Sequence, residues 1–161
     1  MKRYVGLVLV AAALWGGWWA LQAYSLRGEI TGWFEERRAE GWVAEYDSLQ
    51  VRGFPSRLDV TLTNPRLTDP DRGTSWQSPC VQILGLSYQR DHVIVAFADS
   101  QSLVLPDGPV EISSSGLRAS LVTEDRALSR LNLEAEALNI AGEDGNIALA
   151  GVLANFHHLD G

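Results

Sequence analysis

The side chains best suited to acid–base or metal chemistry in this chain are three histidines, His92, His157 and His158. His92 opens an apolar run, so a structural place at a strand end or in the wall of a sheet is favoured over a catalytic role. His157 and His158, with Asp160, could bind a metal only if the two rings converged. Adjacent residues of a strand point to opposite faces, so we expect no metal site there.

The sequence offers no pairing of a nucleophile with a base. It contains no Gly-x-Ser-x-Gly elbow, phosphate-binding loop or Cys-x-x-Cys pair. Residues 113–116, Ser-Ser-Ser-Gly, have the composition of a turn, and the single cysteine, Cys80, fits a small buried hydrophobic residue better than a reactive thiol. Residues 69–73 resemble a calcium loop but lack its later glutamate. We therefore expect no enzymatic activity, no cofactor and no metal.

The charge distribution limits the choice of partner. The formal net charge is −7, and the part after Tyr24 holds 11 basic and 20 acidic side chains, a net of −9. So acidic a surface repels nucleic acid and opposes broad electrostatic binding to an anionic membrane. Arg52, Arg57 and Arg66 bracket a Gly-Phe-Pro break. Contact with lipid head groups or anionic partners is one interpretation of them; a solvated face that balances the acidic surplus is favoured.

An uncharged run from Tyr4 to Tyr24 follows the basic pair Lys2-Arg3. As a helix, its 21 residues span about 32 Å, which matches a hydrocarbon core of about 30 Å. The preceding basic pair predicts a cytoplasmic amino terminus and a periplasmic carboxy-terminal part, in a single-pass protein of the bacterial inner membrane. Aromatic residues typical of membrane interfaces mark this anchor: Tyr4, Trp15, Trp18, Trp19 and Tyr24.

A cleaved signal peptide is the alternative interpretation of the same run. The sequence Leu21-Gln22-Ala23 is a weak cleavage site. The run exceeds the usual signal core of about 7–15 residues, however, and tryptophans stand where small residues should approach the peptidase. An uncleaved anchor over residues 1–24 is therefore favoured.

Residues 25–41 repeat apolar side chains at helical spacing, with glutamates and an arginine on the opposite face. Gly41 can adopt the left-handed conformation that ends a helix. We expect the anchor helix to continue, with or without a kink at Gly28, to about Gly41. The stripe is expected to cover one end of a sheet rather than to bind a partner or the membrane surface; it consists of Leu26, Ile30, Trp33, Phe34 and Arg37.

From Trp42 onward the apolar residues alternate with polar ones, as in half-buried strands. Strands are predicted around residues 49–52, 58–62, 81–88, 92–98, 110–113, 117–123, 131–140 and 147–153. Turn signals stand between them at residues 64–65, 69–73, 89–91, 106–109 and 142–146. No helical pattern intervenes, so we expect an α+β fold in which residues 42–161 form a mainly antiparallel, curved meander.

Such a sheet has one apolar face, which must curl on itself, accept the helix at residues 26–34 or hold an apolar ligand. The last stretch, residues 147–156, still has the pattern of a strand close to the chain end. The sheet is therefore expected to end on an exposed edge. Either the chain is a truncated member of a longer family, or the edge serves a partner. The sequence gives no indication of oligomeric state.

Several motifs resemble one bacterial family. They are Glu36 to Trp42, Val51 to Leu67, Trp76-x-x-Pro79, Gln82 to Tyr88, His92-Val93-Ile94 and Asp99-Ser100-Gln101. Together they resemble the domain-of-unknown-function 2125 family of alphaproteobacteria over essentially the whole chain. The most specific part is Gly53-Phe54-Pro55-x-Arg57-x-Asp59.

More loosely, an anchor helix leading into a β-meander with a Gly-Phe-Pro break is similar to AsmA-like envelope proteins. The resemblance to these proteins implies a curved sheet with an apolar groove, associated with lipid traffic. This likeness is at the level of fold. Neither resemblance supplies catalytic residues.

These observations predict a bitopic envelope protein without enzymatic activity. Its periplasmic sheet would present an apolar surface or edge to lipid or to an envelope protein. The alternative is a structural or assembly subunit of an envelope complex, with no ligand. A periplasmic hydrolase is disfavoured, because no nucleophile–base pair can be nominated.

Overall fold

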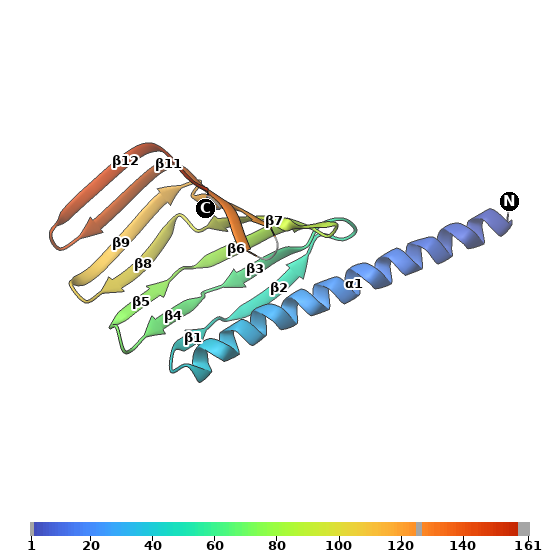
Figure 1. Cartoon of the computed structure of the whole chain (residues 1–161), viewed down its shortest axis with the longest axis horizontal. Coiled ribbons are helices and arrows are strands. Elements are labelled where there is room, and N and C mark those ends of the chain that lie inside the picture. Colours follow the sequence, from blue (N-terminus) through green and yellow to red (C-terminus); the bar gives the residue numbers. More distant parts are fainter. Residues whose placement is uncertain (1, 125–126, 158–161) are drawn as a thin grey trace.

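A computed structural model describes residues 2–124 and 127–157, and it shows one long helix followed by an antiparallel sheet curled into a half-barrel (Figure 1). The elements are α1 (Lys2–Ala39), β1 (Val43–Glu45), β2 (Ser48–Arg52), β3 (Asp59–Thr63), β4 (Arg66–Asp69), β5 (Thr74–Gln77), β6 (Cys80–Leu86), β7 (Gln89–Phe97), β8 (Ser100–Leu105), β9 (Gly108–Ser115), β10 (Arg118–Glu124), β11 (Ala127–Gly142) and β12 (Gly145–His157). The α+β class and the curved meander expected from the sequence are confirmed.

The first ten strands are halves of five longer, bent strands. Each pair, from β1–β2 to β9–β10, is interrupted by only two residues, and the interruptions line up across the sheet. Backbone hydrogen bonds continue over the breaks: the Asn64 N–H donates to the Pro79 carbonyl at 2.9 Å, and the Ser78 N–H donates to the Pro65 carbonyl at 3.2 Å. We call this line of breaks the crease.

The residues at the crease explain why the strands bend there. Asn64 has a positive φ of 48°, and the following Pro65 has no N–H to donate to a ladder. Gly116 and Gly151 continue the same line with φ values of 65° and 64°. The long strand β11 runs through it, so one half pairs with β10 and the other half with β9.

Strands that follow one another along the bent path pair as hairpins, so the sheet is a meander with two edges. At one edge, β1 and β2 lie beside α1 (Figure 1). At the other edge, β12 pairs with β11 alone among the described strands. The half-barrel therefore has one edge next to the helix and one open edge.

Helix α1 is continuous from Lys2 to Ala39 and shows no break at Gly28. Its 38 residues make a rod of about 57 Å. Gly41 follows with a φ of 92°, and the Trp42 N–H donates to the Arg37 carbonyl at 3.0 Å, so the helix ends as a glycine-capped helix does. The segments expected at 1–24 and 25–41 thus form one rod, of which the first half projects beyond the sheet (Figure 1).

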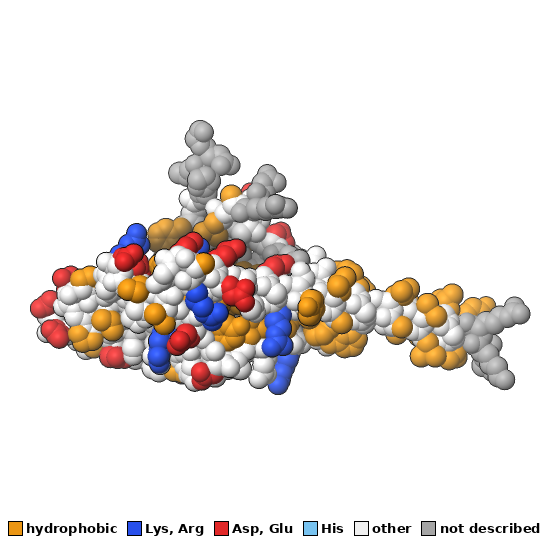
Figure 2. Space-filling model, turned by 90° about the horizontal axis from the view of Figure 1, so that it is seen from below, with side chains coloured by type: hydrophobic (Ala, Val, Ile, Leu, Met, Phe, Trp, Pro, Cys, Tyr) orange, Lys and Arg blue, Asp and Glu red, His pale blue; other side chains and the backbone are white. Residues whose placement is uncertain are grey.

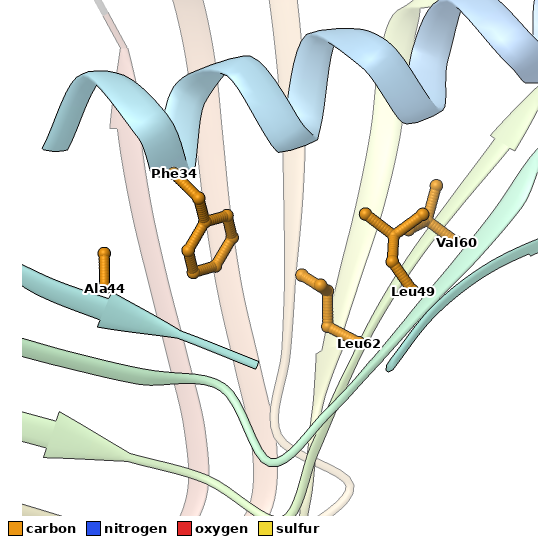
Figure 3. Close-up of a cluster of buried hydrophobic side chains, with 5 residues drawn as sticks. All are labelled: Phe34, Ala44, Leu49, Val60 and Leu62. Carbon is orange, nitrogen blue, oxygen red and sulfur yellow. The ribbon is translucent and has the colours of Figure 1, made fainter. Parts of the chain in front are cut away.

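The core lies between the second half of α1 and the first strands. Phe34 is 3% exposed and points from the helix towards Ala44, Leu49 and Leu62 (Figure 3). Its ring meets that of Tyr46 edge-on, with centroids 4.8 Å apart. The stripe expected at residues 26–34 therefore covers the end of the sheet, as the spacing predicted.

Four strands were not predicted from the sequence, and two turns were misplaced. The short strands β1, β4, β5 and β8 were missed because their sequences, Val-Ala-Glu, Arg-Leu-Thr-Asp, Thr-Ser-Trp-Gln and Ser-Gln-Ser-Leu-Val-Leu, carry few alternating apolar residues. Residues 113–115 belong to β9 instead of a turn; only Gly116 leaves the strand. Residues 89–91 open β7, since the true turn is Ser87-Tyr88.

Replacement of Phe34 by Ala should destabilise the folded chain strongly. A buried Phe→Ala change costs about 3–5 kcal/mol, through lost burial and the cavity left behind. Phe156→Ala is the matched control, because Phe156 is 61% exposed on the edge strand, and it should cost less than about 1 kcal/mol. Chemical unfolding of the detergent-solubilised chain measures both. Equal costs would show that the helix is not packed as described.

Candidate functional site

The loop between β2 and β3, residues 53–58, carries the most specific motif of the sequence and has a tightly defined backbone. Gly53 has a φ of 111°, and the Phe54–Pro55 peptide bond is cis. The Arg57 N–H donates to the Gly53 carbonyl at 2.8 Å, which closes the loop. A Cβ atom at position 53 would stand 2.7 Å from the Cβ atom of Arg57. Only glycine fits there, for reasons of both φ and space.

This loop packs on the projecting half of α1. The indole Nε1 of Trp15 donates to the Pro55 carbonyl at 3.0 Å, and that of Trp19 donates to the Arg57 carbonyl at 2.7 Å. The ring of Phe54 meets that of Trp19 edge-on, with centroids 5.5 Å apart. Trp15 and Trp19 are one helical turn apart and so share a face. We call this set of contacts the tryptophan clasp.

Four backbone carbonyls of the loop accept hydrogen bonds from neighbouring groups. The Gly53, Pro55 and Arg57 carbonyls accept the bonds described above. The Ser56 carbonyl accepts two more, from the N–H of Ser87 at 2.9 Å and from its hydroxyl at 3.1 Å. Ser87 lies in the β6–β7 turn, so the clasp joins the helix, the loop and a second turn into one unit.

The remaining motif residues, Arg57 and Asp59, form an ion pair with Nε and Oδ2 3.0 Å apart. Both side chains are partly exposed, so the pair adds little stability. Its effect is to hold the guanidinium group beside the clasp.

The five aromatic residues expected to mark an anchor have different surroundings in the structure. Only Trp15 and Trp19 contact the loop; Trp18 stacks on Trp15 with ring centroids 5.2 Å apart. Tyr4 and Tyr24 are 78% and 77% exposed. Sequence reasoning found the tryptophans and the motif but missed their contact. The one available signal is the helical spacing that puts Trp15 and Trp19 on the face of Leu26 and Ile30.

One face of the sheet is largely apolar across its width. Cross-strand pairing aligns a row on the face that contacts α1: Val60, Ile83, Val95, Ala119 and Leu133. Beyond the crease, Trp76, Leu103 and Val110 continue the face. A buried polar interruption lies there, since Gln101 accepts a hydrogen bond from the Trp76 indole at 3.0 Å. Among the described strands, β1 and β2 are the ones that lie close to the backbone of α1. Val95 and Leu133, which lie further along the row, are therefore only half-buried.

The histidines do not form a site in the part of the chain that the structure describes. His92 is exposed, and its Nε2 lies 2.9 Å from the Ser120 hydroxyl. His157 is exposed at the end of β12, while His158 and Asp160 lie outside the described residues. Cys80 is partly buried as a free thiol. Within the described ranges, no group of three metal-binding side chains comes together.

Four exposed carboxylates lie in the turns at the end of the sheet away from the clasp. They are Asp71, Asp107, Glu143 and Asp144. Figure 2 shows red side chains at the tip of the sheet, red and blue side chains mixed over its middle, and a largely apolar helix that projects beyond it. A cavity of about 490 Å³ also opens at the acidic end, between the β8–β9 and β11–β12 turns.

The chain matches one family of known proteins. A family model described as "Uncharacterized protein conserved in bacteria (DUF2125)" matches residues 19–160. The chain belongs to this family. The DUF2125 match begins at Trp19 of the clasp and includes the whole loop and sheet. No curated protein and no solved structure matches the chain.

Helix α1 contains one stretch, Tyr4–Ala39, that is long and apolar enough to cross a membrane. None of its most apolar window is buried against the rest of the described structure. The DUF2125 chain thus combines a helix fit to span a bilayer with a half-barrel whose apolar face is only partly covered.

Trp19→Phe should loosen the clasp, because it removes the indole donor and leaves the Arg57 carbonyl without that partner. The loss is about 1 kcal/mol, or roughly fivefold in the population of the detached loop. Trypsin cleavage after Arg57 should quicken by a similar factor. Trp18→Phe is the matched control, since the Trp18 indole donates no hydrogen bond within the described residues. Equal cleavage rates in the two variants would contradict the clasp.

Proposed function

We propose that this DUF2125 protein is a single-pass, non-enzymatic protein of the bacterial inner membrane whose periplasmic half-barrel holds lipid acyl chains on its apolar face. One observation carries the proposal: the apolar face extends from the Phe34 core to the open edge, and no second layer of the described chain covers its far part. A one-faced antiparallel sheet needs an apolar cover. Acyl chains from the adjacent bilayer would supply it.

The clasp supports an uncleaved anchor. Trp15 and Trp19 lie before Leu21-Gln22-Ala23, where a signal peptidase would cut. Cleavage there would remove both indole donors and the partner of the Phe54 ring. The folded sheet therefore uses residues that a signal peptide would discard.

The wider resemblances agree with the proposal. The alphaproteobacterial family membership expected from the motifs would place the chain in an envelope with a periplasm. The likeness to AsmA-like proteins, a helix leading into a curved sheet, would make the half-barrel a short lipid groove. Both are analogies of motif and shape.

A structural or assembly role without ligand is the second candidate, and strand β12 favours it. Its 13 residues form an open edge that can add another strand. Large apolar side chains are exposed along it: Ile147, Leu149, Leu153 and Phe156. A partner strand from an envelope protein would both extend the sheet and cover these side chains.

Native mass spectrometry of the chain extracted in mild detergent tests the lipid role. We expect co-purifying phospholipid, and Leu133→Glu should reduce it several-fold by placing a charge on the apolar face. Asn132→Glu, one residue away on the opposite face, should leave it unchanged. Lipid-free protein that carries a stoichiometric partner would overturn the lipid role in favour of assembly.

The topology has its own test. An alkaline phosphatase fused after Gly161 should be active in cells, because the basic pair before the span keeps the amino terminus in the cytoplasm. A β-galactosidase fusion at the same point should be inactive. A stable but inactive phosphatase fusion would refute the periplasmic placement.

A further inference from the structure

Two turns lie side by side where the projecting half of α1 leaves the sheet (Figure 1). They are residues 53–57 of the β2–β3 loop and residues 87–88 of the β6–β7 turn. Besides the two bonds between Ser87 and Ser56, Leu58 donates its N–H to the Gly85 carbonyl at 3.0 Å. We call this pair of turns the seating tip.

The seating tip presents aromatic rings away from the sheet. Phe54 is 59% exposed and Tyr88 is 66% exposed, although both stand beside well-ordered backbone contacts. Trp15 and Trp18 are also exposed at the same level of the helix. Aromatic rings with this mixture of apolar body and polar edge favour the boundary between acyl chains and head groups.

The backbone of the tip is suited to a region with little water. The Gly53, Pro55, Ser56 and Arg57 carbonyls all accept hydrogen bonds from within the chain. Irregular backbone can enter a bilayer only where its polar groups find partners in the protein. The two indole donors of the clasp supply such partners to the Pro55 and Arg57 carbonyls from the helix itself.

The charge of the tip also differs from that of the rest of the exported part. Residues 53–57 and 87–88 contain one charged side chain, Arg57, and Arg52 directly precedes them, whereas the part of the chain after Tyr24 has a net charge of −9. Both arginines are exposed. Both can meet anionic head groups, Arg57 together with the Asp59 carboxylate that it pairs with, whereas the acidic turns at the other end of the sheet would be repelled.

We propose that the seating tip enters the head-group layer of the outer leaflet of the membrane that α1 spans, and so fixes the depth and orientation of the sheet. The level of Trp15 and Trp19, rather than that of Tyr24, then marks the outer membrane boundary. From Lys2 to Trp19 the helix rises about 26 Å, slightly less than a typical hydrocarbon core. Long basic side chains at its amino end can extend to the inner interface. The inference rests on the proposed membrane span but not on lipid binding by the apolar face.

Spin labels on the full-length chain test the seating tip. In a Cys80→Ser background, labels are placed at Tyr88→Cys, at Phe54→Cys and, as the control, at Val104→Cys, which is exposed on the far half of the sheet. Each protein is reconstituted into vesicles of mixed phosphatidylcholine and phosphatidylglycerol. The relative accessibility of each label to oxygen and to a water-soluble nickel chelate gives its depth.

Labels at positions 54 and 88 should show an oxygen-to-nickel ratio several-fold above that at position 104. The Tyr88 side chain makes no hydrogen bond or ring contact within the described residues and does not take part in the clasp, so a label at position 88 still reports depth if the label at position 54 disturbs the clasp. A ratio at position 88 equal to that at position 104 would overturn the seating tip. Absence of co-purifying lipid alongside a seated tip would refute the groove and leave this inference standing.

Discussion

The structure depends on a single constraint: its antiparallel sheet is apolar on one face, and the described residues form no second sheet to pack against that face. Burial of an apolar side chain is worth about 1.5–3 kcal/mol, so a sheet of this width cannot remain flat and bare. Curvature covers part of the apolar face, because it buries small residues such as Val81, Ala119 and Ala135. Helix α1 covers another part, because it places Phe34 on the first strands. The far half of the face has neither cover, and the proposed lipid or partner strand would supply one.

The crease shows how the curvature is encoded. Prolines 65 and 79 fall on adjacent bent strands, at points where an N–H is not needed in the ladder. Glycines at positive φ take over the same line at positions 116 and 151. Because every strand bends at the same level, the two halves of the sheet turn towards each other while the hydrogen-bond ladders continue. The bend is therefore a property of the whole sheet, set by one or two residues per strand.

Sequence patterns predicted the helix, the meander and the one-sided face, because each depends on local periodicity. They missed β1, β4, β5 and β8, since Thr74–Gln77 and its neighbours take their strand conformation from pairing partners and not from their own apolar content. The parts of the candidate site were predicted separately, without the contact that joins them. The motif at Gly53–Asp59 and the tryptophans of the anchor were both identified, but their contact spans 38 to 40 residues, a separation that no local spacing encodes.

Because α1 is continuous, its two contacts with the rest of the chain together fix the orientation of the helix relative to the sheet. Phe34 fixes the helix to the core, and Trp19 fixes it to the loop about 22 Å away along the same rod. A helix held at one point could pivot about the sheet, whereas a helix held at two points cannot. The orientation of the sheet relative to the span then follows from covalent geometry and these two contacts. In the proposed placement, with α1 spanning a bilayer and the seating tip in its head-group layer, the apolar face would start at the membrane boundary and lead away from it. An acyl chain could then pass from the leaflet to the face without crossing the acidic turns at the far end.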